Sequence, residues 1–312
     1  MAEKIATREA YGKALAEFGA IYENLVVLDA DLAAATKTGV FKKAFPERHF
    51  DCGIAENNMI GVATGMSLCG KIPFASSFAM FAAGRSFEQV RNSIGYPHNN
   101  VKIGATHGGI TVGEDGATHQ CNEDLALMRT IPGMVVINPA DAAEARLAVK
   151  AAIEYNGPVY LRFGRMAVPT LFDDSYDFQI GKGVKLADGT DVAIIATGIE
   201  VEQALLARDM LAEEGISASV INIATIKPLD EELVVAEAEK CGAIVTCEEH
   251  SVIGGLGAAV CECLAEKKPV PVLRIGINDE FGRSGPAKEL LALYKLDAKA
   301  IAEKAKAAIA LK

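Results

Sequence analysis

The chain has 312 residues, half of them hydrophobic, and its 41 acidic and 31 basic residues give a net charge of −10. This acidic balance, without any basic run, argues against nucleic acid as a partner. The longest weakly polar stretch, residues 59–83, is interrupted by Lys71 and is rich in Gly and Ser, so we do not expect a membrane span.

The seven cysteines form no C-x-x-C pair, and the first residues of the chain lack the apolar stretch of a secretory signal. We therefore expect reduced thiols and a cytoplasmic location. Cys261 and Cys263 are too close in sequence to be helix partners and lack a second ligand pair, so we do not expect a zinc site, and we assign no metal ligand to this chain.

Short apolar runs alternate with helical patterns through the first half of the chain. This alternation is typical of βαβ units and a parallel sheet. The expected strands are 25–29, 72–76, 101–105, 134–137 and 158–162, and the expected helices are 7–19, 55–69, 79–95, 122–130 and 140–154.

The pattern changes over residues 165–190, which hold Pro169 together with several Asp and Gly residues and are typical of a linker or hairpin. The alternation then restarts. The expected strands are 191–197, 218–223, 242–247 and 271–275, and the expected helices are 200–214, 230–240, 255–266, 286–293 and 297–310. We predict an α/β protein with two domains, residues 1–172 and 188–312, joined by a linker at 173–187.

Residues 106–120 are the segment most indicative of function. They hold His107 and His119, two of the five histidines of the chain, with four glycines and two acids between them. Such a segment cannot pack a core, and it follows an expected strand, where the sites of α/β proteins gather. We interpret it as the polar wall of a pocket for a small, hydroxyl-rich ligand; the alternative is a surface loop with incidental histidines.

Glu56 opens an otherwise apolar helix. An acid in the first turn can simply complement the helix dipole. Here the following helix face is small and apolar, so we expect Glu56 to lie at the edge of a buried layer, where a carboxylate can exchange protons near neutrality. The spacing of Phe74, Phe78 and Phe81 by itself is more typical of a core stripe.

Four motifs occur in a characteristic order: Gly-Ile-Ala-Glu at 53–56, Phe-Ala-Met-Phe-Ala-Ala-Gly at 78–84, Thr-His at 106–107 and Gly-Glu-Asp-Gly-Ala-Thr-His-Gln at 113–120. In this order they resemble the C-terminal half of transketolase, over most of residues 5–312. The resemblance implies a pyrimidine-binding parallel-sheet domain followed by a transketolase C-terminal-like α/β domain. It also implies an enzyme that uses thiamine diphosphate to move two-carbon ketol units between sugar phosphates.

The resemblance assigns the cofactor-binding residues. Glu56 matches the glutamate that hydrogen-bonds the aminopyrimidine ring, and we expect it to be catalytic. Phe78 and Phe81 match aromatic residues around that ring, whereas a third aromatic of the family aligns with Ala75. Asp31 matches an aspartate near the thiazolium side.

The resemblance also assigns the substrate-binding residues. Asp115 and His119 match residues that bind the hydroxyls and carbonyl of the donor sugar, and His119 is expected to assist proton transfer as a catalytic residue. His107 matches a residue nearer the phosphate. Arg8 and Arg162 match the two arginines that grip the phosphate, a role that suits the planar fork of guanidinium donors.

The sequence lacks the Gly-Asp-Gly motif with which thiamine enzymes hold Mg²⁺ and the diphosphate. The resemblance therefore implies a split transketolase, in which a separate N-terminal diphosphate-binding subunit supplies these groups, Mg²⁺ included. The chain is expected to self-associate as a dimer, within an α₂β₂ assembly.

Three alternatives remain open at this point. The first is the β-subunit of a 2-oxoacid dehydrogenase, and the second is an enzyme of the deoxyxylulose-5-phosphate synthase type, because both share Gly-Ile-Ala-Glu. The third is a non-catalytic binding module with a transketolase-like fold. Residues 248–251 and 254–257 resemble structural elements that help the family dimerise, and we expect no catalytic role for His250.

Overall fold

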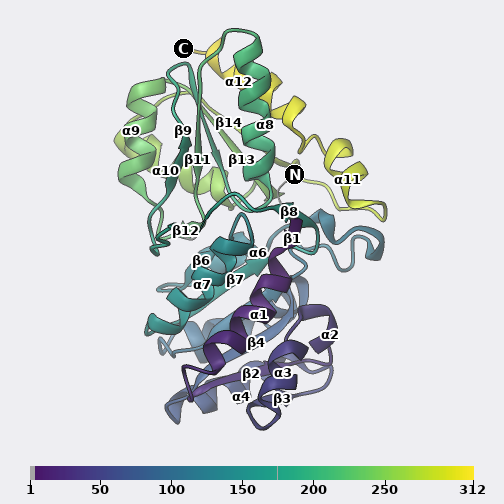
Figure 1. Cartoon of the computed structure of the whole chain (residues 1–312). Helices are drawn as coiled ribbons and strands as arrows, with labels where there is room; N and C mark the ends of the chain where they lie inside the picture. The colour runs from purple at the N-terminus through teal and green to yellow at the C-terminus, as the bar shows by residue number, and fades with distance from the viewer. Residues whose placement is uncertain (1–3, 174) are drawn as a thin grey trace.

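A computed structural model of the chain describes residues 4–173 and 175–312. The first three residues of the expected first domain and Asp174 of the expected linker lie outside this description. The described chain forms two stacked α/β units, with the early residues in the lower unit of Figure 1 and the late residues in the upper one. The expected fold class is confirmed.

The lower unit is built on a seven-stranded sheet in the order β12-β6-β7-β5-β4-β2-β3, parallel throughout except for β12. The five strands expected in this half are all present, within two residues of the expected ends, and β3 is an additional short strand. The strands are β2 (Leu25–Asp29), β3 (His49–Asp51), β4 (Ile72–Phe78), β5 (Lys102–Thr106), β6 (Val135–Ile137), β7 (Val159–Phe163) and β12 (Thr225–Lys227).

Helices cover both faces of this sheet. On one face lie α1 (Thr7–Gly19), α3 (Gly39–Ala44) and α7 (Ala142–Glu154). On the other lie α4 (Glu56–Leu68) and α6 (Asp124–Arg129). The helix expected at 79–95 is irregular: wide π-type turns at Met80–Arg85 and Val90–Gly95 flank the short α5 (Phe87–Gln89). Two further short helices are α2 (Ala33–Thr36) and η1 (Pro46–Arg48).

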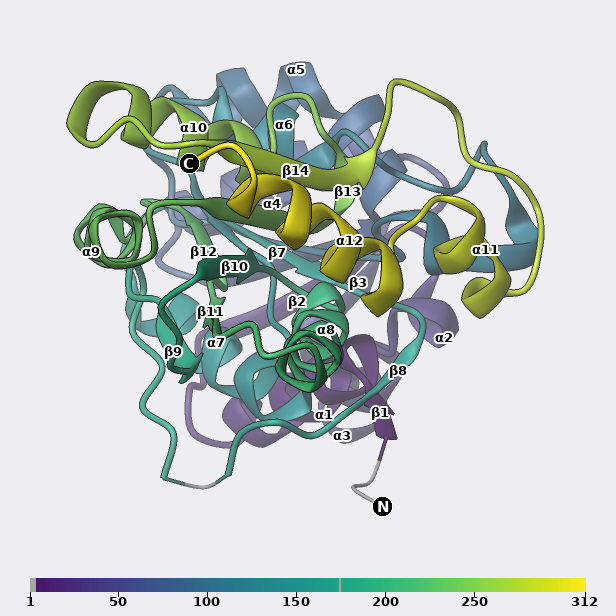
Figure 2. The ribbon, with the colours of Figure 1, turned by 90° about the horizontal axis from the view of Figure 1, so that it is seen from above.

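The upper unit is built on a five-stranded sheet in the order β14-β13-β10-β11-β9, parallel except for β9. Its strands are β9 (Val184–Ala187), β10 (Val192–Ala196), β11 (Ala218–Asn222), β13 (Ile244–Ser251) and β14 (Val272–Ile277). Helices α8 (Glu200–Glu213) and α12 (Ala298–Ile309) pack on one face, and α9 (Glu231–Cys241) and α10 (Leu256–Lys267) on the other (Figure 2). The short α11 (Ala287–Leu293) completes this unit.

One strand of the second half of the chain belongs to the lower sheet. Strand β12 lies in the second half of the sequence but pairs with β6 of the lower sheet. Strand β8 (Ala167–Pro169) pairs with β1 (Lys4–Ala6), so that residues just after the lower sheet return to the start of the chain. The segment expected to be a linker or hairpin therefore holds strand β9, which pairs with β11 rather than with a neighbour in sequence.

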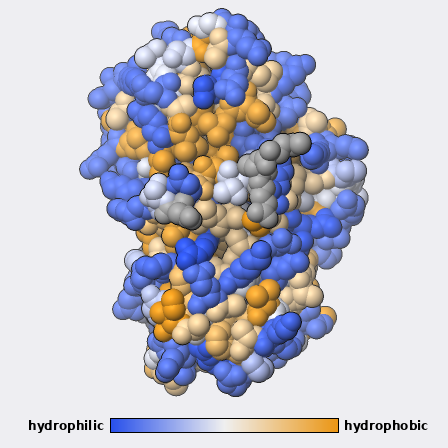
Figure 3. Space-filling view, in the orientation of Figure 1, coloured by the Kyte–Doolittle hydropathy of each residue, from blue (hydrophilic) through white to orange (hydrophobic). Residues whose placement is uncertain are grey.

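The surface seen in Figure 3 is hydrophilic over most of its outline, and hydrophobic side chains gather in the middle of the upper unit. Among the described residues, none of the helices has the length and apolar character needed to cross a membrane.

Candidate active site

The expected site residues gather at one edge of the lower sheet. In a parallel sheet, the carboxyl ends of all strands meet at the same edge, where ligands bind in α/β folds. Asp31 follows β2, Phe78 ends β4, and His107 follows β5. Glu56 begins α4, shortly after β3. The fold thus brings together residues that are far apart in the sequence.

Phe78 is the centre of an aromatic cluster at this edge. Its ring stacks on the imidazole of His107 with the centroids 3.8 Å apart, and on Phe81 at 5.8 Å. His119 meets both phenyl rings edge-on, at 6.2 Å from Phe78 and 5.5 Å from Phe81. The two histidines of the glycine-rich segment therefore share one site, and Phe78 and Phe81 belong to it rather than to a core stripe.

Glu56 is buried and forms an ion pair with Arg85, whose Nη1 donates to Oε2 of the carboxylate at 2.9 Å. The guanidinium of Arg85 also lies over the ring of Phe81, 4.6 Å from its centroid, and its side chain is half exposed. Arg85 was not among the sequence-predicted residues. In the sequence, the feature that could have indicated Arg85 is its position as a lone basic residue four positions after Phe81.

A buried carboxylate beside the half-exposed Phe81 suits one class of ligand. A flat heteroaromatic ring can lie against phenyl groups while a ring nitrogen hydrogen-bonds to the carboxylate. A pocket opens next to these residues, lined among others by Phe81, Arg85, Thr118 and Phe281. The carboxylate of Glu56 and the phenyl rings of Phe78 and Phe81 therefore fit an aminopyrimidine ring.

At the other side of the cluster, Nη1 of Arg8 donates to Nε2 of His107 at 2.9 Å and to the carbonyl of Ala35 at 3.0 Å. Arg8 lies in the first turn of α1, which is fixed to the end of β7 because the amide of Gly164 donates to the hydroxyl of Thr7. Burial, together with the positive charge of Arg8, lowers the pKa of His107 to about 3. His107 is thus neutral and supports Arg8.

Arg165, two residues beyond the end of β7, is the second guanidinium in this region. Its positive charge lowers the pKa values of both Arg8 and His107, after burial as the main cause. Its Nη1 donates to the carbonyl of Val112 and to Glu114 at 2.8 Å, and a third of its side chain remains exposed. Arg165 was not among the residues predicted from the sequence.

Arg162 lies apart from this group. Its side chain is only 3% exposed, and its Nε donates to Asp124 at 2.9 Å in a fully buried ion pair. Its Nη2 donates to the carbonyls of Cys121 and Glu249. Because residue 162 is inside a central strand, its side chain ends within the protein rather than at the open edge. Buried partners thus engage both Nε and Nη2 of its guanidinium.

Asp31 and Asp115 are both exposed at the open edge. The backbone of Asp31 adopts a φ of +60°, and its amide donates to Asp51 at 3.1 Å. Below it, Asp29 is buried and accepts hydrogen bonds from the hydroxyls of Thr36 and Thr38, while burial raises its pKa. The exposed carboxylates of Asp31 and Asp115 are free to face a ligand.

Comparisons with known proteins identify the family of the two parts of the chain. Residues 3–170 match the family model "Transketolase, pyrimidine binding domain", and residues 181–301 match "Transketolase, C-terminal domain". The chain is 54% identical over 303 residues to the putative transketolase C-terminal section of Methanocaldococcus jannaschii, an alignment that covers 95% of this chain and 94% of the relative.

Two further relatives cover nearly the whole chain. The 6-deoxy-6-sulfo-D-fructose transketolase subunit SqwH of a Clostridium species, strain MSTE9, is 45% identical over 294 residues, which are 94% of this chain and 91% of the relative. A solved structure described as "Split gene transketolase, inactive beta4 tetramer" is 56% identical, with a TM-score of 0.93 and 99% of each chain covered.

Proposed function

The chain belongs to the transketolase family as the C-terminal subunit of a split transketolase, and from this premise we propose that it transfers two-carbon ketol units between ketose and aldose phosphates. The observation that carries the proposal is the convergence of Glu56, the Phe78 cluster and Arg8 at one open edge of the lower sheet. These residues supply a ring site and an anion site side by side.

Thiamine diphosphate, when bound, supplies the carbanion-stabilising chemistry that breaks and forms the carbon–carbon bond. In this chain, Glu56 would hold the aminopyrimidine ring through a hydrogen bond and exchange a proton with it, while Phe78 and Phe81 would pack against the ring. The ion pair with the half-exposed Arg85 supports this role, because it gives the buried Glu56 a partner whose long side chain can move aside.

His119 and Asp115 are proposed to bind the donor sugar. His119 is half-buried against the two phenyl rings, and its Nδ1 lies 3.0 Å from the hydroxyl of Thr118. An imidazole held by ring contacts keeps one nitrogen available for proton transfer to a sugar hydroxyl or carbonyl. Asp115, exposed in the same loop, orients the hydroxyl groups.

The phosphate end of the site is proposed to consist of Arg8 and Arg165, with Arg165 in the place that the sequence analysis gave to Arg162. Arg165 is partly exposed and its charge acts on Arg8, whereas Arg162 is buried and paired with Asp124. His107 supports Arg8 as a neutral acceptor. Lys37, which also contributes to the positive field at His107, adds a third cation to this end.

The diphosphate group and Mg²⁺ are assigned to a separate N-terminal subunit, and helix α4 offers a surface for subunit contact. Gly61 and Gly65 are exposed in its interior, and a Cβ added at either would meet nothing within 4 Å. Glycine weakens a helix interior by about 1 kcal/mol relative to Ala, so packing within the chain does not account for them. Exposed Ile54 and Leu68 flank them, which supports close packing against another subunit in an α₂β₂ enzyme.

The test is ketol transfer from xylulose 5-phosphate to ribose 5-phosphate with thiamine diphosphate and Mg²⁺. The chain is assayed alone and together with a candidate diphosphate-binding chain. Activity only in the mixture supports the proposal, and no transfer by a confirmed complex contradicts it. Because the relative SqwH is named for a sulfonated sugar, 6-deoxy-6-sulfofructose should be compared with fructose 6-phosphate as the donor.

A further inference from the structure

Glu249 links the upper unit to the loop that carries the proposed sugar-binding residues. It lies on β13 of the upper unit and is buried. Its Oε1 accepts a hydrogen bond of 2.6 Å from the backbone amide of Thr111, which is 138 positions earlier in the chain. Thr111 is in the turn Ile110–Asp115, between His107 and His119. A carboxylate of one unit therefore holds the backbone of the other.

The glycines of this loop pack against the same support. Gly109 has a φ of +78°, and a Cβ there would lie 2.2 Å from the carboxyl carbon of Glu249. A Cβ at Gly108 would lie 2.3 Å from Nε of Arg162. The absence of side chains at these two glycines thus lets the loop backbone pack against Glu249 and Arg162. Packing within this chain, rather than a ligand, requires their small size.

The far end of the loop rests on the upper unit as well. The side-chain Nε2 of Gln120 donates to the carbonyls of Ile110 at 3.0 Å and of Arg283 at 2.8 Å. A Cβ at Gly116 would lie 2.5 Å from the hydroxyl of Ser284. Asp115 and His119 are therefore carried on a loop that the upper unit holds at both ends, through Glu249 and through residues 283–284.

From this geometry we infer that Glu249 is a positioning residue of the sugar site. Its carboxyl group fixes the amide of Thr111 and thereby the place of Asp115 and His119, although it touches neither substrate nor cofactor. The inference rests on the proposed function only in taking the ligand of the loop to be a sugar. The hydrogen bond between Thr111 and Glu249 is present in the chain by itself.

The charges around Glu249 determine which substitution is informative. From the packed elements, Arg162 of β7, Asp124 of α6 and Glu200 of α8 face this region. Burial raises the pKa of Glu249 to about 7 against the opposing charge of Arg162. An ionised or a protonated carboxyl group can accept from the Thr111 amide, and so can the oxygen of a glutamine side chain. A glutamine should therefore preserve the contact, whereas an alanine removes it.

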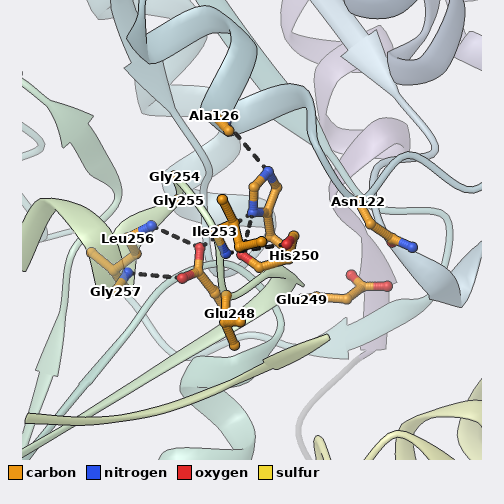
Figure 4. Close-up of polar contacts among 12 residues, drawn as sticks. Asn122, Ala126, Glu248, Glu249, His250, Ile253, Gly254, Gly255, Leu256 and Gly257 are labelled. Atoms are coloured by element: carbon orange, nitrogen blue, oxygen red, sulfur yellow. Dashed lines mark hydrogen bonds and ion pairs between the residues drawn. The ribbon is translucent and has the colours of Figure 1, made fainter. Parts of the chain in front are cut away.

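The neighbouring Glu248 provides a matched control. Successive side chains of a strand point to opposite faces, and Figure 4 shows Glu248 directed at Leu256 and Gly257, with Glu249 pointing away from them. The carboxylate of Glu248 accepts from the amides of Leu256 at 2.7 Å and Gly257 at 2.8 Å, at the start of α10. Removing the carboxylate of Glu248 therefore perturbs the same strand of the upper unit but no contact with residues 107–120.

The first readout needs no activity. Amide hydrogen exchange of residues 107–120 is measured in the isolated chain for the wild type, E249A, E249Q and E248A. We expect at least about tenfold faster exchange at Thr111 in E249A, near wild-type exchange in E249Q, and faster exchange confined to α10 in E248A. Unchanged exchange at Thr111 in E249A, or the same loop opening in E248A, would overturn the inference.

The second readout uses the complex with the diphosphate-binding chain. In E249A we expect kcat/KM for xylulose 5-phosphate to fall about 10- to 100-fold, with the affinity for thiamine diphosphate unchanged and activity restored in E249Q. If E249A does not fold, E249D serves instead, because it keeps the charge and shortens the reach by one methylene. Wild-type kcat/KM in E249A, or in E249D where it is used instead, overturns the inference. An inactive wild-type complex contradicts the proposed function and leaves the exchange result to decide.

Discussion

Nη1 of Arg8 lies 2.9 Å from Nε2 of His107, and because a guanidinium can only donate, the imidazole nitrogen must be the acceptor. The proton of the neutral ring is therefore on Nδ1, which lies 2.8 Å from the hydroxyl of Thr106 and donates to it. A positive charge on His107 would break this arrangement, since Nε2 would then carry a proton directed at Arg8.

His107 should make the chain less stable in acid. Its folded pKa of about 3 is below the unfolded value near 6.5. The unfolded state therefore binds the extra proton as the pH falls below 6.5, and the stability that the neutral ring contributes is lost. Between pH 7.5 and 5 this group should cost about 2 kcal/mol of unfolding free energy. Denaturant unfolding of H107N should show a shallower pH dependence than wild type, and equal slopes would contradict the assignment.

Glu56→Gln should abolish most turnover without unfolding the chain. An amide cannot act as the charged partner of the cofactor ring, and loss of a proton-transfer group costs about 10² to 10⁴ in rate. The kcat of the reconstituted complex and the melting temperature of the chain are the two measurements. Glu88→Gln, an exposed change on the neighbouring helix, is the control. A near-normal kcat for Glu56→Gln would sink the proposed site.

Arg165→Ala should act mainly on KM for the phosphorylated donor. A contact with a remote phosphate contributes mostly uniform binding, so KM should rise about 10- to 100-fold while kcat changes little. Arg165→Lys keeps the charge but not the forked geometry, so its KM should lie between the wild-type value and that of Arg165→Ala. A loss of kcat at constant KM would show that Arg165 acts on the chemical step instead.

Arg162→Ala should instead act on stability. Removing the guanidinium leaves the fully buried Asp124 without its ion-pair partner, and breaking such a pair typically costs about 3 to 5 kcal/mol. Arg165→Ala, at the surface, should change the unfolding free energy by less than about 1 kcal/mol. Urea unfolding of both variants separates them; a stable Arg162→Ala chain with a raised KM would return the phosphate role to Arg162.

Gly65→Leu should block assembly while leaving the chain folded. The position is open in the described chain and lies in a helix interior, where Leu is favoured over Gly by nearly 1 kcal/mol. We expect an unchanged or higher melting temperature, together with loss of subunit association in analytical ultracentrifugation. Ala212→Leu, an exposed change near the end of α8, should do neither. Normal assembly of the Gly65→Leu chain would remove α4 from the proposed interface.

Local patterns predicted most of the helices and strands because each has a clear period and clear ends. The helix expected at 7–19 is observed at Thr7–Gly19. Elements with no local period were missed: β3 has only three residues, and the pairing of β12 with β6 depends on topology alone. The expected helix at 79–95 has the right apolar spacing, but its wide turns are not visible in that spacing.

The site shows the same division. His107, His119 and Glu56 stood out by residue type, and their shared edge follows from parallel strands. The choice between Arg162 and Arg165 could not be made from types or family spacing, because three positions separate a buried strand residue from a half-buried loop residue. Arg85 and Glu249 are proposed to act through contacts with other site residues. In the sequence, Arg85 is signalled only as a lone basic residue after Phe81, and Glu249 has no signal.

The pairing of β12 with the lower sheet limits how this protein can be cut into separate fragments. A fragment ending in the segment between the two units would lose β12, and β6 would then present an unpaired edge, which invites aggregation. It would also lose Glu249, the acceptor for the Thr111 amide. The two family-defined regions of this chain therefore depend on each other for folding. Encoding them as two separate chains would part the proposed sugar-binding loop from Glu249, which holds it.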